Sequence, residues 1–177
     1  MKKSILILLP LIFLLITACD NAPKETLFEK EKKAQIDLAK EEAKVTELLD
    51  LLASSTESGN IEMIEKIWLP SEDVVLIGTE NDEKLVGWSQ IKEAITGQAS
   101  SFEETLISIT DQNVWFDRDA RTAWFFEELN YNFIYNNKAM SLDGIRFTGV
   151  LYKTDEGEWK LVQGHLSMPA SIDMDEE

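Results

Sequence analysis

A few polar side chains in the second half of this chain have the chemistry to bind a ligand or to move a proton. Arg146 can pair with an anionic or carbonyl group, and His165 is the single histidine of the sequence. Glu127 is a carboxylate that could act as a base. The remaining candidates offer hydroxyl or amide groups and are Tyr131, Thr148, Gln163 and Ser167. These residue types suit a small-molecule pocket, which needs a few polar groups in an apolar wall.

The elements that position these residues are strands. Aromatic and β-branched residues predict strands at about 103–116, 121–135, 140–153 and 158–168. Turn residues separate them, at Asn136-Asn137-Lys138 and at Thr154–Gly157. Because alternate residues of a strand point to opposite faces, the hairpin loops decide which candidates lie together.

Both hairpins predict that the candidates share one face. A four-residue loop at 154–157 places Arg146 opposite His165 and Thr148 opposite Gln163. A two-residue loop at 136–137 places Arg146 opposite Glu127, whereas a four-residue loop places it opposite Leu129. Either register puts all seven candidates on one face, with an apolar wall made of Phe125, Val150 and Leu161.

The opposite face is predicted to be apolar enough for a subunit interface, although a helix could also cover it. Its residues are Trp124, Phe126, Glu128, Phe147, Val162 and Leu166. Structural roles compete with the pocket: Glu127 and Arg146 could form a cross-strand ion pair, and His165 could be satisfied by a neighbour in the core. An arginine beside Glu127 would also lower the pKa of this carboxyl group and weaken it as a base.

Helices are predicted before the strands. Good helix formers predict a helix over about 25–56, and Ser58-Gly59-Asn60 ends it. The helix carries an apolar stripe near helical period, made of Leu38, Val45, Leu48, Leu49 and Leu52. Shorter helices are expected at about 61–68 and 88–95, with a buried strand at 74–78 between them. Helices followed by a run of antiparallel strands predict an α+β fold.

The N-terminus has the pattern of an exported protein. Two lysines precede an uncharged run over 5–18, which is short for a membrane-spanning helix of about 20 residues and fits a signal peptide. Ile16-Thr17-Ala18-Cys19 then resembles the bacterial lipobox. The resemblance implies cleavage of the signal peptide 1–18 and acylation of Cys19, with palmitate among such acyl groups. We therefore expect a lipoprotein anchored in the membrane and facing the periplasm or the cell surface.

The charge of the chain excludes some partners. The formal charge is −16, and loss of Lys2 and Lys3 with the signal peptide leaves 15 basic against 33 acidic residues, or −18. Such a surface repels nucleic acid and anionic headgroups, so membrane contact is left to the lipid. With one cysteine and one histidine, the chain offers no zinc cluster and no internal disulfide. We expect neither metal nor cofactor.

The strand region resembles a SnoaL-like domain of the nuclear transport factor 2-like superfamily over about 41–169. The resemblance is carried by Val75–Thr79, Ala123-Trp124-Phe125, Arg146–Leu151 and, above all, Gly157–Pro169. It implies a cone-shaped, cystatin-like α+β roll in which N-terminal helices pack on a curved antiparallel sheet. A pocket at the open end and dimers formed through the sheet are also implied. The superfamily contains isomerases, cyclases and binding modules, so this fold does not determine the function.

Three functions follow from these observations. We favour a lipoprotein, lipidated at Cys19 and extended by a polar tether and helical arm over 19–40. Its domain at 41–169 would bind a small ligand or assemble with a partner in the cell envelope, and an acidic tail follows at 170–177. One alternative is a proton-transfer enzyme that uses His165 or Glu127. The other is a structural envelope protein without a ligand.

Overall fold

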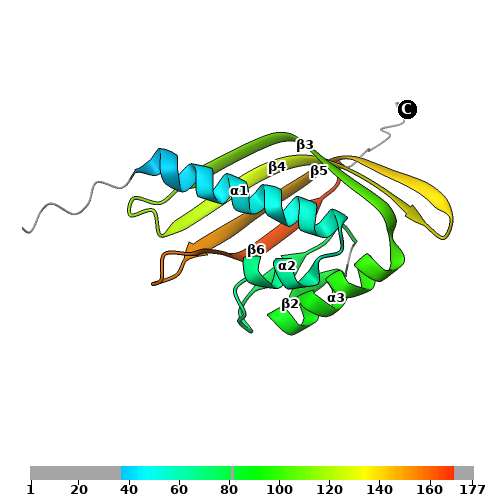
Figure 1. Ribbon diagram of the computed structural model, residues 1–177, viewed down its shortest axis with the longest axis horizontal. Helices are drawn as coiled ribbons and strands as arrows, with labels where there is room; N and C mark the ends of the chain where they lie inside the picture. The colour runs from blue at the N-terminus through cyan, green and yellow to red at the C-terminus, as the bar shows by residue number, and fades with distance from the viewer. Residues whose placement is uncertain (1–36, 81, 170–177) are drawn as a thin grey trace, which may run out of the picture. The chain divides into compact units, whose positions relative to one another are not determined.

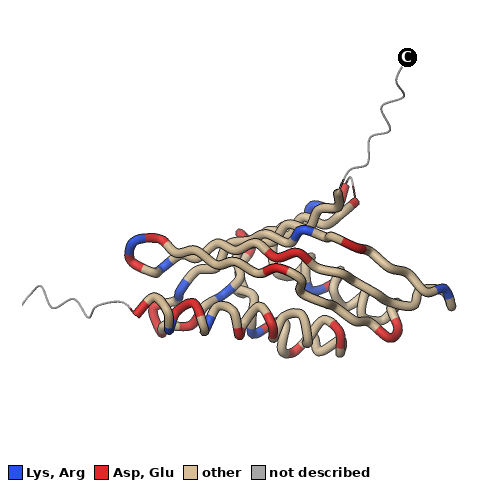
Figure 2. Tube along the Cα trace, turned by 90° about the horizontal axis from the view of Figure 1, so that it is seen from above, with Lys and Arg blue, Asp and Glu red and all other residues tan. Residues whose placement is uncertain are grey.

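The helices of the chain pack on one side of a curved sheet. The computed structural model describes residues 37–80 and 82–169, and Figure 1 shows how their helices and strands are arranged. α1 spans Leu38–Glu57, α2 spans Ile61–Ile67 and α3 spans Trp88–Ser101. Figure 2, turned by 90°, shows the helices on one side of the sheet; we call the other side, which no described helix covers, the uncovered face.

Six strands form one sheet in the order β2-β1-β6-β5-β4-β3. The two short strands are β1 (Val75–Ile77) and β2 (Lys84–Val86), and the four long ones are β3 (Glu103–Phe116), β4 (Thr122–Tyr135), β5 (Lys138–Lys153) and β6 (Trp159–Ser167). All neighbouring pairs are antiparallel except β1 and β6, which run parallel. The sheet is therefore mixed and not purely antiparallel as predicted.

Side-chain caps explain where the first two helices begin. The Asp37 carboxylate accepts a hydrogen bond from the backbone N–H of Lys40 at 3.2 Å and starts α1. The amide oxygen of Asn60 accepts one from the backbone N–H of Met63 at 3.1 Å and starts α2. Gly59, with φ of +61°, makes the turn between them, as the predicted helix break requires. The part of the predicted helix before Asp37 lies outside the described residues.

The strand predictions are confirmed to within one or two residues, because alternation and turn chemistry agree. Asn136 and Asn137 have φ of +51° and +59°, the left-handed pair that a two-residue hairpin requires, and Tyr135 pairs with Lys138. α3 is longer than the predicted helix at 88–95, since it continues to Ser101. The sequence pattern did not predict β2.

The hydrophobic core lies between the helices and the covered face of the sheet. Its buried members come from all three helices and from the three long central strands: Val45, Leu49, Ile64, Ile67, Trp68, Trp88, Ile91, Ala123, Phe125, Leu129, Ile145, Phe147, Leu151, Trp159 and Leu161. Trp68 and Trp88 stack with ring centroids 6.2 Å apart. The cone predicted by the family resemblance is therefore packed with side chains for much of its length.

The signal peptide, Cys19, the tether to residue 36 and the acidic tail lie outside the described residues, and the predictions about them stay predictions. Among the helices that the structure describes, none is long and apolar enough to cross a membrane.

Candidate functional site

Glu127 is a carboxylate buried between α1 and the sheet. It lies on the covered face of β4 and is 3% exposed. The side-chain amide of Gln112 on β3 donates to Glu127 Oε1 at 2.7 Å, and the same nitrogen lies 3.3 Å from Asp50 Oδ1 on α1. One amide thus connects two carboxylates from different elements. This arrangement provides no cation for Glu127.

Burial makes Glu127 an unusual acid. The pKa of this carboxyl group is raised to about 7: removal from water raises it most, the Gln112 hydrogen bond lowers it, and the negative charge of Asp50 raises it. A carboxyl group with this pKa can both hold and release a proton near neutral pH. The predicted neighbour Arg146, which would have lowered the pKa, is not there.

A small cavity lies further along the covered face, near the C-terminal ends of α1 and α3. Its volume is about 10 Å³, enough for about one water molecule. The lining residues are Thr56, Gly59, Ile64, Ile95, Gln98, Ala99, Phe102, Thr105 and Tyr131. Small-molecule pockets are far larger, roughly 300–1,000 Å³. The pocket expected from the family resemblance is therefore nearly closed at this position.

Tyr131 provides a polar group at this cavity. Its hydroxyl oxygen accepts a hydrogen bond from the side-chain amide of Gln98 at 2.5 Å. Burial raises the pKa of the Tyr131 hydroxyl, the Gln98 hydrogen bond lowers it, and the carboxylate of Glu57 raises it. Glu57 also accepts the backbone N–H of Ile107 on β3 at 2.7 Å. The electrostatic field at this end of the domain therefore favours neutral or cationic groups over anions.

The structure divides the predicted site between the two faces of the sheet. Glu127 and Tyr131 lie on the covered face with the core residues of β4. The remaining candidates pair with one another on the uncovered face: Thr148 with His165, Arg146 with Ser167, and Val150 with Gln163. The prediction that all seven share one face is therefore wrong for Glu127 and Tyr131. Binding roles for either group stay predictions.

Two β-bulges cause the error in register. Leu129 pairs with Ile145 but Tyr131 pairs with Leu142, so β5 has one extra residue near Gly144, whose φ is +66°. The extra residue places Arg146 opposite Glu128 and moves Glu127 to the other face.

The second bulge lies in β6 at Val162. Val150 pairs with Gln163 and Leu151 with Leu161, which leaves Val162 unpaired. Lys153 also pairs with Trp159, so the loop before β6 is one residue longer than the predicted 154–157. The bulge and the longer loop together shift the register by two residues, so that Arg146 faces Ser167 and not His165 as predicted. The bulges also divide the predicted apolar interface: Phe147 is buried in the core and Leu166 packs against it, whereas Trp124 belongs to the uncovered face. Leu161, predicted in the pocket wall, is buried in the core as well.

Aromatic side chains are exposed on the uncovered face. Trp115 on β3 and Trp124 on β4 are direct cross-strand partners and are 45% and 44% exposed. The same row continues across the sheet through Val150, Gln163, Val75 and Val86. Two rows of paired residues further along the same face lie Asp111, Glu128, Arg146 and Ser167. We call this surface the tryptophan face.

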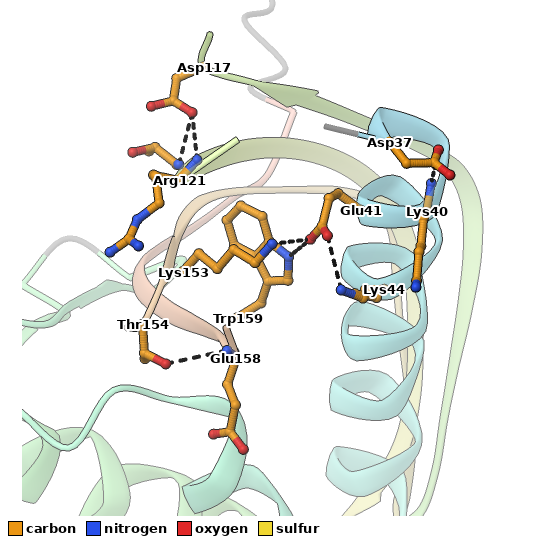
Figure 3. A network of polar contacts seen from close by, with 11 residues as sticks. Asp37, Lys40, Glu41, Lys44, Asp117, Arg121, Lys153, Thr154, Glu158 and Trp159 are labelled. Carbon is orange, nitrogen blue, oxygen red and sulfur yellow. Dashed lines mark hydrogen bonds and ion pairs between the residues drawn. The ribbon is translucent and has the colours of Figure 1, made fainter. Parts of the chain in front are cut away.

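A second buried carboxylate, Glu41, lies near the start of α1 (Figure 3). It accepts hydrogen bonds from Lys153 Nζ at 2.7 Å, Trp159 Nε1 at 2.9 Å and Lys44 Nζ at 3.0 Å. Burial alone would raise the pKa of Glu41, but these three donors lower it to about 2. The cluster joins α1 to β5 and β6 through three charge-assisted hydrogen bonds, so we assign it to stability. No local sequence pattern indicates this cluster, because its members lie up to 118 residues apart.

Among residues 37–80 and 82–169, no group of His, Cys, Asp and Glu side chains is placed to hold a metal ion.

The class of the protein follows from its architecture: helices on one face of a curved, unclosed six-stranded mixed sheet define the nuclear transport factor 2-like α+β fold. Residues 45–171 match the SnoaL-like domain. The chain therefore belongs to the SnoaL-like domain family, whose members bind ligands or act in catalysis.

Solved structures support the fold assignment. A nuclear transport factor 2-like superfamily protein from Salmonella enterica superposes with a TM-score of 0.71 at 16% identity, covering 79% of this chain and 99% of that one. A nuclear transport factor 2-like protein of unknown function from Pseudomonas putida gives 0.62 at 12% identity, covering 80% and 95%. A cystatin-like protein from Caulobacter vibrioides gives 0.62 at 13% identity, covering 74% and 91%. No curated protein matches this sequence.

Proposed function

We propose that this chain is a lipoprotein, acylated on Cys19, whose SnoaL-like domain is a binding module that assembles through its tryptophan face. The anchor is supported by the uncharged run at 5–18 and by Ile16-Thr17-Ala18-Cys19, which holds the single cysteine. The domain would face the extracytoplasmic side of the membrane. Assembly is preferred over storage of a small ligand because the described cavity accommodates only about one water molecule.

The observation that carries this proposal is the exposure of Trp115 and Trp124 side by side on a face that no described helix covers. Monomeric proteins seldom expose contiguous aromatic surface, and tryptophan is enriched at the centres of protein interfaces. Phe126 lies two residues beyond Trp124 on the same face and extends the surface. A partner would remove these rings from water.

A second copy of the chain is the simplest partner. A two-fold interface must be complementary to itself. On the tryptophan face the acidic residues Asp111 and Glu128 lie on β3 and β4, whereas Arg146 lies on β5 of the same row. A two-fold axis between these strands would place the arginine of each copy near the acidic residues of the other. An envelope protein of basic or neutral surface is the alternative partner.

The assembly is tested by the molar mass of the full chain in solution, with Cys19→Ser introduced to prevent acylation. Light scattering should give a dimer, and Trp124→Glu should give a monomer because it buries a charge in the interface. Tyr135→Glu is the matched control: Tyr135 is 44% exposed but lies at the β4–β5 hairpin. A monomeric parent protein, or a dimer that survives Trp124→Glu, would contradict association of copies through this face.

The anchor is tested separately on the native, detergent-extracted protein. Intact-mass analysis should find a chain that starts at Cys19 and carries added acyl mass. A chain that retains Met1 would contradict the lipoprotein assignment.

A proton-transfer enzyme is the second candidate, because Glu127 is 3% exposed and burial raises its pKa to about 7. Such a group suits a general base. The test is isotope exchange at the acidic C–H bonds of a panel of cyclic ketones in deuterated buffer. Exchange that follows Glu127 ionisation and is lost in Glu127→Gln would support the enzyme. Equal rates for parent and variant would reject it.

A further inference from the structure

The second half of β3 presents backbone hydrogen-bonding groups at the edge of the sheet. β3 is the last strand in the sheet order, and Figure 1 shows it at the outer margin. Its pairing with β4 shifts between Ile109 and Asp111 and is regular from Asp111 to Phe116. This regular stretch is about as long as an average strand.

The direction of these backbone groups follows from the turn after β3. The backbone N–H of Asp117 donates to the Thr122 carbonyl oxygen at 3.0 Å, so the backbone of Asp117 faces β4. In an antiparallel pair, residues that bond to the neighbouring strand alternate with residues that do not. The N–H and C=O groups of Gln112, Val114 and Phe116 therefore point away from β4. Within residues 37–80 and 82–169 these groups meet no backbone partner. We call residues 111–116 the open edge.

Other positions on the edges of the sheet are closed by side chains. In the first half of β3, the outward N–H of Ile107 donates to Glu57 Oε1 at 2.7 Å. On the opposite edge of the sheet, the N–H of Val86 donates to Gln90 Oε1 at 3.3 Å. Proteins protect sheet edges because free backbone groups pair with other chains. An edge without such protection is suited to the addition of a strand from a partner.

The side chains of the open edge indicate which strand would fit. Those exposed on the tryptophan face are Asp111, Asn113 and Trp115. Those half-buried on the covered face are Gln112, Val114 and Phe116. A cation beside the first set could pair with Asp111 or lie over the ring of Trp115. An apolar side chain beside the second set would extend the packing of Val114 and Phe116 on the core.

The β3 strand of a second copy does not fit this edge. Two β3 strands paired antiparallel about Val114 would place Asp111 of each copy opposite Asp117 of the other. Like charges directly opposite each other destabilise a strand pair. Each chain also carries a formal charge of −16, which repels a second copy and attracts a basic partner.

We propose that the open edge accepts an antiparallel strand from a basic partner protein, in which cationic residues alternate with apolar ones. The apolar residues lie opposite Gln112, Val114 and Phe116 and exchange backbone hydrogen bonds with them, because the two residues of a hydrogen-bonded pair share a face. The cationic residues lie beside Asp111 and Trp115. This inference does not depend on association of copies through the tryptophan face.

The backbone pairing is tested with a fluorescein-labelled peptide, Lys-Val-Lys-Ile-Lys-Val, and the full chain carrying Cys19→Ser. Fluorescence anisotropy should show binding. N-methylation of the valines and isoleucine removes the N–H groups that face β3 and should abolish binding. N-methylation of the lysines, whose N–H groups face away, is the matched control and should preserve binding. No binding of the unmodified peptide, or equal binding of the two methylated peptides, would overturn the proposal.

The position of the site is tested at Val114. Val114→Pro removes an outward N–H without removing a hydrogen bond to β4, and should weaken binding about tenfold because a peptide carbonyl loses its donor. Val114→Ala is the matched control, since it truncates the same side chain but keeps the N–H, and should bind about as well as the parent. Equal affinities of the two variants would overturn the assignment to this edge.

The chemistry of the partner is tested with the same peptide carrying glutamate in place of lysine, which should not bind. Equal binding of the acidic peptide would overturn the basic partner. The basic peptide should still bind Trp124→Glu, the variant expected to abolish the dimer, so the two proposals can fail separately. Self-association that is lost in Val114→Pro and kept in Val114→Ala would place a second copy on the open edge, and would also overturn the basic partner.

Discussion

At the scale of single residues, two buried carboxylates should respond to pH in opposite directions. Glu127 meets an uncharged amide and a second carboxylate, whereas Glu41 meets two ammonium groups and an indole N–H. The folded protein therefore favours the protonated form of Glu127 and the ionised form of Glu41. The difference comes from the neighbours, since both residues are buried.

Glu127 should destabilise the fold above neutral pH. Its pKa rises from an ordinary value of 4.5 to about 7 in the folded protein, so the folded chain holds a proton that the unfolded chain releases between these values. Stability should fall as pH rises from 4.5 through 7, by about 3 kcal/mol at 1.36 kcal/mol per pKa unit. In urea unfolding, Glu127→Gln should be more stable than the parent at pH 8 and should lose this dependence. A variant that keeps the parent's slope would show that another group causes it.

Glu41 should stabilise the fold at neutral pH and fail to do so in acid. Its pKa is lowered from 4.5 to about 2, so its contribution is complete above 4.5 and is lost as pH falls toward 2. Because the Lys44 and Lys153 side chains that pair with Glu41 are 42% and 18% exposed, solvent screening limits the effect to about 1–2 kcal/mol. Unfolding of Glu41→Gln should show this loss at pH 7 and little of it at pH 1.5, below the folded-state pKa. An equal loss at both values would indicate a packing defect instead.

At the scale of elements, the close contact of β5 and β6 depends on a pair of glycines. Gly149 pairs with Gly164 on the covered face, and the ring of Phe125 fills the space above Gly149. A Cβ atom at 149 would press on the backbone carbonyl oxygen of Gln163 and lie 2.6 Å from Phe125 Cε1. A carbonyl within a strand pair has little freedom to move, so the strands themselves would have to separate.

Gly149→Ala should therefore lower the free energy of unfolding by about 1–3 kcal/mol, the usual effect of overpacking a core. Chemical denaturation measures it. Gly97→Ala, where nothing lies within 4 Å of the new methyl group, serves as the control and should keep or slightly raise the stability. Equal stability of the two variants would mean that the strands separate without lowering the free energy of unfolding.

The strands of this domain were predictable, but their faces were not. Alternation and the Asn136-Asn137 turn locate β4 and β5 because these signals are local. A single extra residue reverses every face that follows it, and two such residues lie between the candidates. Gly144 carried a signal, since a glycine inside a strand suggests a bulge. Val162 carried none, because valine is a favourable strand residue.

The candidate site, too, was predictable only in part. Arg146, Thr148, His165 and Ser167 were predicted on one face and do share it, because the longer loop before β6 and the bulge at Val162 each shift the register by one residue and together restore the face. The environment of Glu127 could not be predicted, since Gln112 and Asp50 reach it from other elements. The small size of the cavity beside Tyr131 could not be predicted either, because a cavity depends on how distant side chains pack.

At the scale of the whole molecule, net charge opposes the proposed dimer. Each chain carries a formal charge of −16, and acidic residues are spread over the helix and strand surfaces in Figure 2. Two bodies of this charge with centres about 30 Å apart would repel by tens of kcal/mol in pure water, since each unit pair contributes 332/εr. A local pair such as Arg146 with Glu128 contributes about 0–1 kcal/mol when exposed. The long-range repulsion therefore outweighs local attraction at low salt.

Dimerisation should accordingly become tighter as salt is added. Screening shortens the range of the repulsion from about 30 Å at 0.01 M to about 10 Å at 0.1 M, while burial of Trp115 and Trp124 is unaffected. Sedimentation of the Cys19→Ser chain should show a dissociation constant that falls several-fold over this range and levels off above it. A constant that rises with salt would mean that ion pairs, and not the exposed tryptophans, hold the copies together. In that case Arg146→Ala should abolish the dimer and Trp124→Ala should weaken it little.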